Sequence, residues 1–97
     1  MFINLIQFPA IKTGKEAEFK DWFAWSNTIY AKFEGFISRR LLKSSQENGG
    51  YAAIVEHESY ATFMAMHTSV ERQQVWAKVE LLIEGTPTPQ FYEVVIS

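Results

Sequence analysis

The chain contains no cysteine among its 97 residues, so a disulfide framework, a thiolate zinc site and a thiol nucleophile are all excluded. It also has no basic run longer than Arg39-Arg40, and its nine Lys and Arg are outnumbered by eleven Asp and Glu, for a formal net charge of −2. The basic surface typical of nucleic-acid binding is missing. We therefore predict no nucleic-acid partner.

Long hydrophobic runs are absent as well. No apolar stretch approaches the roughly 18 residues of a membrane-spanning helix, so we predict no membrane contact. The opening MFINLIQFPAIK has neither a basic leader nor a small-residue cleavage site, and we expect a soluble cytoplasmic protein. A chain of this length has room for one core only, which predicts a single domain over residues 1–97.

Aromatic residues are abundant. They make up 15% of the chain, with eight Phe, three Trp and four Tyr, and hydrophobic residues in total reach 47%. This content is high for a small domain. We expect part of the apolar surface to meet a second chain or a ligand.

The first half of the chain reads as a strand followed by a helix. Residues 2–8 are apolar and β-favouring and close at Pro9, which predicts a strand. Residues 15–33 predict an amphipathic helix of about five turns that Gly35 ends. Its inward side chains recur at steps of three and four and are Phe19, Trp22, Phe23, Ser26, Ile29, Tyr30 and Phe33.

The second half begins with a hairpin. Strands at residues 36–44 and 51–58 flank QENGG, the strongest turn signal in the chain. Ser59 then caps a short helix over residues 60–67, and Thr68 or Ser69 caps a second helix that Gly85 ends. A last strand is predicted over residues 90–96.

The predicted order is β-α-β-β-α-β with the second helix broken in two. It indicates an α+β, ferredoxin-like antiparallel sheet with helices on one face. The uncovered face lacks the polar alternation of a wet sheet, because residues 51–55 and 92–96 are apolar on both sides. We therefore predict a homodimer in which two sheets pack face to face.

Five segments, TGKEAEF with Trp22 after it, FEGF, HESYATF, MHTS and YEVV, follow one another over nearly the whole chain. In this order they resemble the antibiotic biosynthesis monooxygenase (ABM) family, whose small domains pair as dimeric α+β barrels. The resemblance implies a cavity between sheet and helices in each subunit. It also implies oxygenation of a small aromatic or quinol-like substrate with no cofactor.

One branch of that family degrades haem, and this chain departs from its pattern. The branch places an Asn on the first strand, a Trp at the end of the third strand and a His on the last helix, where this chain has Gln7, His57 and Trp76. The axial iron ligand is thus replaced by Trp76. Haem degradation is the least favoured of the implied activities.

Both histidines lie within the stretch IVEHESYATFMAMHTS, flanked by acidic residues. A closed metal site needs three or four converging ligands, and the spacing of His57, His67 and the flanking glutamates matches no known pattern. We predict no metal site. His67 is expected near the end of its helix, where it interacts with the last carbonyl groups.

His57 is the candidate catalytic base. It shares a strand face with Val55, Ala53 and Tyr51, and the resemblance turns that face toward the cavity. A neutral imidazole could accept a proton near physiological pH. The alternative is a histidine that is hydrogen-bonded at the end of a strand and has no chemical role.

Four residues are predicted to bind substrate. The Gln7 amide and the Trp76 indole N–H could each hold a substrate oxygen. Trp22 and Phe63 could line a flat apolar ligand, although such residues also serve as ordinary core. Of the Arg39-Arg40 pair, one side chain is expected in solvent and the other on a partner such as Glu93 or Glu56.

Two functions follow from the sequence. The first is a cofactor-independent monooxygenase whose small-molecule aromatic ligand lies in the cavity. The second is a non-catalytic small-ligand-binding or stress-related dimer of the same fold.

Overall fold

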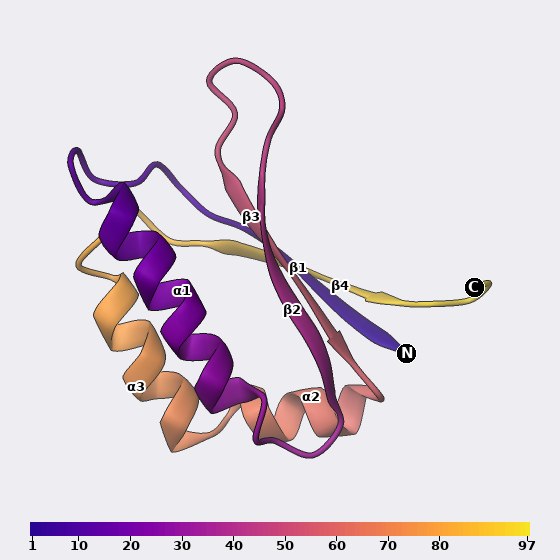
Figure 1. Ribbon diagram of the computed structural model, residues 1–97. Coiled ribbons are helices and arrows are strands. Elements are labelled where there is room, and N and C mark those ends of the chain that lie inside the picture. Colours follow the sequence, from indigo (N-terminus) through magenta and orange to yellow (C-terminus); the bar gives the residue numbers. More distant parts are fainter.

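The computed structural model describes residues 1–97 and shows a four-stranded sheet with three helices on one side of it (Figure 1). The elements are β1 (Phe2–Gln7), α1 (Glu16–Tyr30), β2 (Phe36–Lys43), β3 (Tyr51–His57), α2 (Tyr60–His67), α3 (Val70–Val79) and β4 (Thr88–Glu93). None of these helices has both the length and the apolar character needed to cross a bilayer.

The sheet order is β2-β3-β1-β4, and every neighbouring pair is antiparallel. The predicted fold class, a ferredoxin-like antiparallel sheet with helices on one face, is confirmed. Figure 1 shows α1 and α3 running side by side, α2 near the end of the sheet where β3 stops, and the β2–β3 hairpin projecting away from the helices. The sheet is open at both edges.

A β-bulge at the start of β2 decides which of its side chains face the helices. Phe36 pairs with His57, but Ser38 pairs with Glu56, so Ile37 is an extra residue on β2. Because side chains alternate along a strand, one extra residue reverses the alternation from that point onward. Arg39 consequently lies on the helix-covered face.

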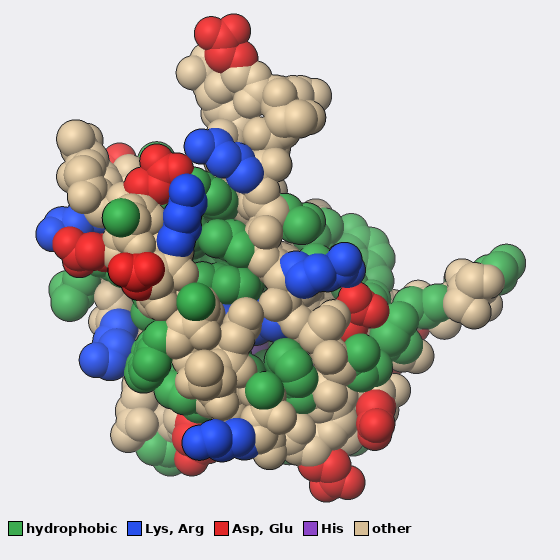
Figure 2. Space-filling view, in the orientation of Figure 1, with side chains coloured by type: hydrophobic (Ala, Val, Ile, Leu, Met, Phe, Trp, Pro, Cys, Tyr) green, Lys and Arg blue, Asp and Glu red, His purple; other side chains and the backbone are tan.

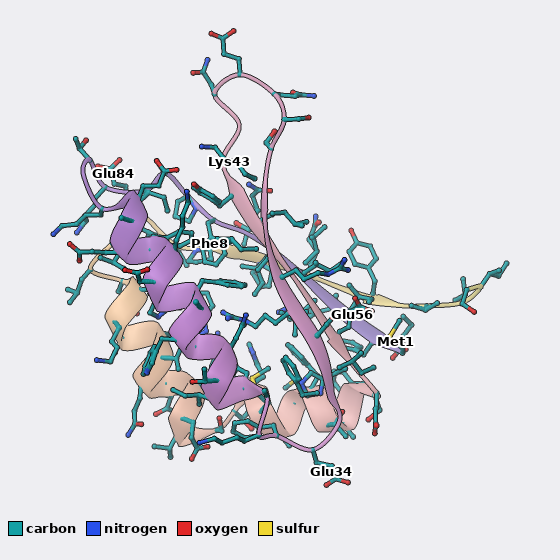
Figure 3. All side chains as sticks on the ribbon, in the orientation of Figure 1. Met1, Phe8, Glu34, Lys43, Glu56 and Glu84 are labelled. Carbon is teal, nitrogen blue, oxygen red and sulfur yellow. The ribbon has the colours of Figure 1, made fainter.

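Aromatic rings gather into two separate groups between the sheet and the helices. The Phe8 cluster consists of Phe8, Phe19, Trp22, Phe23, Tyr51 and Trp76. The Phe2 cluster consists of Phe2, Phe36, His57, Tyr60, Phe63, His67 and Phe91. Ring centroids within the clusters lie 5.0 to 6.3 Å apart. Figure 3 shows Phe8 where the chain leaves β1 beside α1.

Two helices are shorter than predicted. The helix expected over residues 15–33 ends at Tyr30. The last helix, expected to reach Gly85, ends at Val79, because the following residues pair with the chain beyond β1. The Lys12 amide donates to the Leu82 carbonyl oxygen at 2.9 Å, and Ile83 bridges to Ile11.

The last strand was predicted over residues 90–96, but β4 spans Thr88–Glu93. Proline is tolerated at position 89 because β4 is an edge strand. The backbone N–H that proline lacks would point to the open edge, where there is no neighbouring strand. The strand stops where β1 begins, since Glu93 pairs with Phe2. Beyond it, the Val94 amide still donates to the Met1 carbonyl oxygen.

Glycine is required at position 35, where the chain turns from α1 into β2. Its φ of +82° lies in the left-handed region, and a Cβ there would sit 2.3 Å from the Oγ1 atom of Thr62 on α2. The Thr62 hydroxyl cannot move away, since it contacts Ser59 and His57. The missing side chain at position 35 thus allows α2 to dock on the end of the sheet.

We predict that Gly35→Ala destabilises the protein more than Gly14→Ala does. Gly14 has a similar φ of +79° but open space around it, so its replacement carries only the conformational cost, about 1–2 kcal/mol. Gly35→Ala adds a steric clash of about 1–3 kcal/mol. Urea denaturation of both variants measures the difference, and equal losses would contradict the close packing.

Candidate functional site

A cavity of about 330 Å³ lies between the sheet and the helices. Its floor includes Arg39, Val55 and Asn4, which are neighbours across β2, β3 and β1. The other lining residues are Ile6, Tyr30, Phe63, Met66, His67, Arg72, Trp76, Glu80, Gly85, Thr86, Pro87 and Pro89. Trp76 comes from the Phe8 cluster, whereas Phe63 and His67 come from the Phe2 cluster, so the cavity occupies the space between the two.

Arg39 is the most deeply buried charge in the cavity, with 7% of its surface exposed. Its Nη1 atom donates to the hydroxyl of Ser26 at 2.6 Å and to the side-chain oxygen of Asn27 at 2.8 Å. The guanidinium also lies over the rings of Phe23 and Tyr30, with its Cζ atom 4.0 and 4.6 Å from their centroids. All of these partners are neutral.

The guanidinium of Arg39 stays protonated in spite of its burial. Desolvation lowers its pKa to about 10, which is still far above physiological pH. Arg72 has a lowered pKa for the same reason, and its Cζ atom lies 5.0 Å from the centroid of the Trp76 ring. The cavity therefore contains two arginine cations.

Two neutral polar groups in the cavity lack partners. The hydroxyl of Tyr30 and the Oδ1 atom of Asn4 are buried without a hydrogen bond, in side chains 2% and 3% exposed. The Trp76 indole approaches the Tyr30 hydroxyl, yet no hydrogen bond of good geometry forms between them. Burial raises the pKa of Tyr30, and the cations of Arg39 and Arg72 offset part of that increase. The phenol is therefore neutral at physiological pH.

His67 lines the cavity at the end of α2. Its ring stacks on Phe63, with centroids 5.2 Å apart and an angle of 22° between the planes. Burial, and then the charge of Arg72, lower the pKa of His67. A neutral imidazole at this position can accept a proton from a bound molecule.

His57, the base predicted from the sequence, is fully buried at the end of β3 and does not line the cavity. Its Nδ1 atom lies 3.0 Å from the Thr62 hydroxyl. That hydroxyl donates to the Ser59 carbonyl oxygen, so Nδ1 carries the proton and Nε2 is left as an acceptor without a partner. Burial lowers the pKa of His57, and the nearby Glu58 partly opposes the shift.

Of the four predicted binding residues, the structure brings Phe63 and Trp76 to the cavity. The Trp22 indole is buried in the Phe8 cluster and donates from Nε1 to the Val75 carbonyl oxygen at 2.9 Å, a bond that joins α1 to α3. Gln7 lies on the opposite face of the sheet, where its amide donates to the Tyr51 carbonyl oxygen. Neither Trp22 nor Gln7 lines the cavity.

Sequence reasoning missed Asn4, Tyr30, Arg39 and Arg72 as members of the site. The Arg39-Arg40 pair was expected to divide between solvent and an acidic partner, and Arg40 does pair with Glu56 at 3.0 Å. The available signal was the alternation of β2, but a regular strand would have turned Arg40 inward. The bulge at Ile37 selects Arg39 instead. No group of three or more His, Asp or Glu side chains is arranged to hold a metal ion.

No protein-family model matches the chain, and no curated protein matches it by sequence. Solved structures match its fold over almost the full length. A candidate antibiotic biosynthesis monooxygenase from Nitrosomonas europaea has a TM-score of 0.82 at 12% identity, covering 99% of this chain and 100% of its own. SnoaB, a cofactor-independent oxygenase from Streptomyces nogalater, has a TM-score of 0.78 at 18% identity, covering 99% and 92%.

A third match, a candidate antibiotic biosynthesis monooxygenase from Caulobacter crescentus, has a TM-score of 0.82 at 19% identity and covers 98% of this chain and 91% of its own. At such identities the likeness shows the fold. The resemblance seen in the sequence is therefore confirmed for the architecture of the domain.

We predict that the protein loses stability as the pH falls through the ordinary pKa of histidine, about 6.5. Because the folded state lowers the pKa of His57 and His67, the unfolded chain binds more protons below that value, and the free energy of unfolding decreases. Urea titrations between about pH 7.5 and pH 5.5 measure the slope. His57→Gln should flatten it, whereas Glu58→Gln, which removes the opposing charge, should steepen it. An unchanged slope in His57→Gln would contradict this account.

Proposed function

We propose that the protein is a cofactor-independent monooxygenase that acts on a small aromatic or quinol-like substrate in the cavity. One observation carries the proposal: a partly open cavity between sheet and helices has aromatic walls, Phe63 and Trp76, and a neutral histidine, His67, on its lining. The shared fold with SnoaB, itself a cofactor-independent oxygenase, supports it. The substrate supplies the electrons, so no cofactor is required.

The chemistry needs little from the protein. A base removes a proton from an acidic C–H of the substrate, and the carbanion passes one electron to O₂. The resulting radicals combine to a hydroperoxide, which loses water to leave a ketone, so one oxygen atom enters the product and the other leaves as water. An apolar enclosure favours these steps because it excludes bulk water from the carbanion.

The geometry favours His67 over His57 as the base. A base must come within hydrogen-bond reach of the proton that it removes. His67 lines the cavity, whereas the free Nε2 atom of His57 is sealed inside the protein. We keep His57 as the alternative base, since it is the residue that the sequence predicts.

We also propose a homodimer that buries the sheet face away from the helices. The two central strands present Ile3, Leu5 and Ile54 on that face, all only half-buried in the single chain. The C-terminal tail adds Val95 and Ile96, which are 89% and 90% exposed. Figure 2 shows apolar side chains along this tail, clear of the body of the molecule. A second copy would cover both features.

The second candidate function is ligand binding without catalysis, in a stress-related or other small-ligand-binding dimer. It is favoured by the number of polar groups that line the cavity, because Arg39, Arg72, Tyr30 and Asn4 suit recognition and none of them is a base at physiological pH. Haem degradation stays the least favoured activity. The cytoplasmic location also stays a prediction from the sequence.

We predict oxygen uptake when the purified protein is mixed with a hydroxyanthrone or a quinol. His67→Ala should lower the rate by about a hundredfold or more, the usual contribution of a general base, and His57→Ala should lower it much less. An oxygen electrode follows the rate, and circular dichroism verifies that each variant is folded. If His57→Ala removes the activity while His67→Ala keeps it, His57 is the base. If the wild type consumes no oxygen with any such substrate, the non-catalytic function replaces this one.

We predict that the protein sediments as a dimer at micromolar concentration and that Leu5→Asp makes it a monomer. A carboxylate in the centre of the apolar face would lose its hydration in the dimer. Leu81→Asp is the matched control, since Leu81 is an exposed leucine outside the sheet. Analytical ultracentrifugation measures the mass. A monomeric wild type, or equal behaviour of the two variants, would contradict the dimer.

A further inference from the structure

The cavity carries positive charge inside a negatively charged chain. Its lining holds two arginines and a single carboxylate, that of Glu80, which is exposed, although the formal charge of the whole chain is −2. The four ion pairs of the protein all lie elsewhere and use Lys15, Lys20, Arg40 and Lys43. Neither Arg39 nor Arg72 has a carboxylate within 4 Å. The two cavity cations therefore lack a counter-charge.

Arg39 also has hydrogen-bond donors to spare. Only its Nη1 atom donates to the protein, to Ser26, Asn27 and the Phe23 carbonyl oxygen. The Nε and Nη2 atoms have no partner, yet they are not among the sealed polar atoms of the protein. Since the side chain lines the cavity, a ligand there is the partner available to these donors. Three neutral groups hold one edge of the guanidinium and leave the other edge free.

Other unpartnered polar groups lie around the same space. Both Arg39 and Arg72 are near enough to the Tyr30 hydroxyl to influence it, which places the two cations on one region of the cavity. The Tyr30 hydroxyl and the Asn4 amide oxygen lack hydrogen-bond partners, and the Trp76 indole lies close to that hydroxyl. These two oxygens are sealed below the surface of the cavity, so the unpaired donors of Arg39 and Arg72 are the groups that a ligand can reach.

We propose that Arg39 and Arg72 form a receptor for the carboxylate of a planar aromatic ligand whose ring lies between Trp76 and Phe63. This inference deepens the proposed function, on which it rests, by naming the class of molecule that the cavity takes. A guanidinium presents its donors in a plane that matches a carboxylate. The carboxylate of the ligand would pair with the two arginines, which form no ion pair within the protein.

Charge and size favour a carboxylate over a phosphate. Two arginines against one glutamate leave a net charge of +1 in the lining, which suits a monoanion, whereas a phosphate monoester carries a charge of about −1.5 to −2. The volume of about 330 Å³ is at the small end of ligand pockets, and it fits about one or two fused rings. An acidic group on a small aromatic ring meets both conditions.

The test is a calorimetric titration of the full-length protein with 1-naphthoate, with its neutral amide 1-naphthamide, and with 1-naphthyl phosphate. We expect naphthoate to bind at least tenfold more tightly than the amide, and the affinity to fall as salt is added. Arg72→Gln should weaken naphthoate binding about ten- to a hundredfold and leave the amide unchanged, because a charge-assisted hydrogen bond is lost. Arg40→Gln is the matched control and should bind like the wild type.

Arg39→Gln should have the same effect as Arg72→Gln. Arg39 is buried and its replacement can prevent folding, so the decisive result comes from Arg72, which is only partly buried. Equal binding of naphthoate and naphthamide, no binding of naphthoate at millimolar concentration, or an Arg72→Gln variant that binds normally would each overturn the receptor. Tighter binding of naphthyl phosphate would overturn its assignment to a carboxylate.

The titration and the oxygen-uptake assay can fail separately, because naphthoate has no acidic C–H to be oxidised. Selective naphthoate binding by a protein that consumes no oxygen with anthrones or quinols would leave the receptor standing and remove the oxygenase. Oxygen uptake with neutral substrates, together with no preference for naphthoate, would do the reverse.

Discussion

The helices rest on the sheet through two groups of aromatic rings, and the site depends on the distance between those groups. The Phe8 cluster joins α1 and α3 to the sheet at one end, and the Phe2 cluster joins α2 at the other. Aromatic rings are rigid, so the two clusters keep the helices from packing closer to the strands in the interval between them. The row formed by Arg39, Val55 and Asn4 crosses the sheet in this interval and forms the floor of the cavity. Polar side chains are tolerated there because the space is not filled.

Much of the fold could be predicted from the chain alone. The spacing of apolar residues located the helices and strands, Gly35 and Ser59 marked a turn and a cap, and the turn QENGG joined the hairpin. Element ends were less predictable, because long-range pairing decides them. The contact of Lys12 with Leu82, far apart in the sequence, stops α3 early, and no local pattern contains that information.

The site was predictable only in part. Phe63 and Trp76, two of the four residues predicted to bind substrate, do line the cavity. Gln7 was chosen by its position in a family pattern, but the alternation of β1 puts it on the other face of the sheet. Arg39 and Tyr30 lie on different elements, and their meeting requires the docking of α1 on β2. A single sequence gives no measure of such distances.

The β-bulge at Ile37 has a consequence for how this cavity could change. Removal of Ile37 would leave Arg39 opposite Val55 and facing the cavity, because Phe36 and Ser38 would then be consecutive partners of His57 and Glu56. If Ile37 instead entered the ladder opposite Glu56, every later residue of β2 would shift by one position, so that Arg40 would face the helices and Arg39 would turn away. The pairing state of one residue outside the cavity therefore decides which arginine charges it. A substitution at position 37 that favours regular pairing would change the ligand preference of the cavity without altering any residue that lines it.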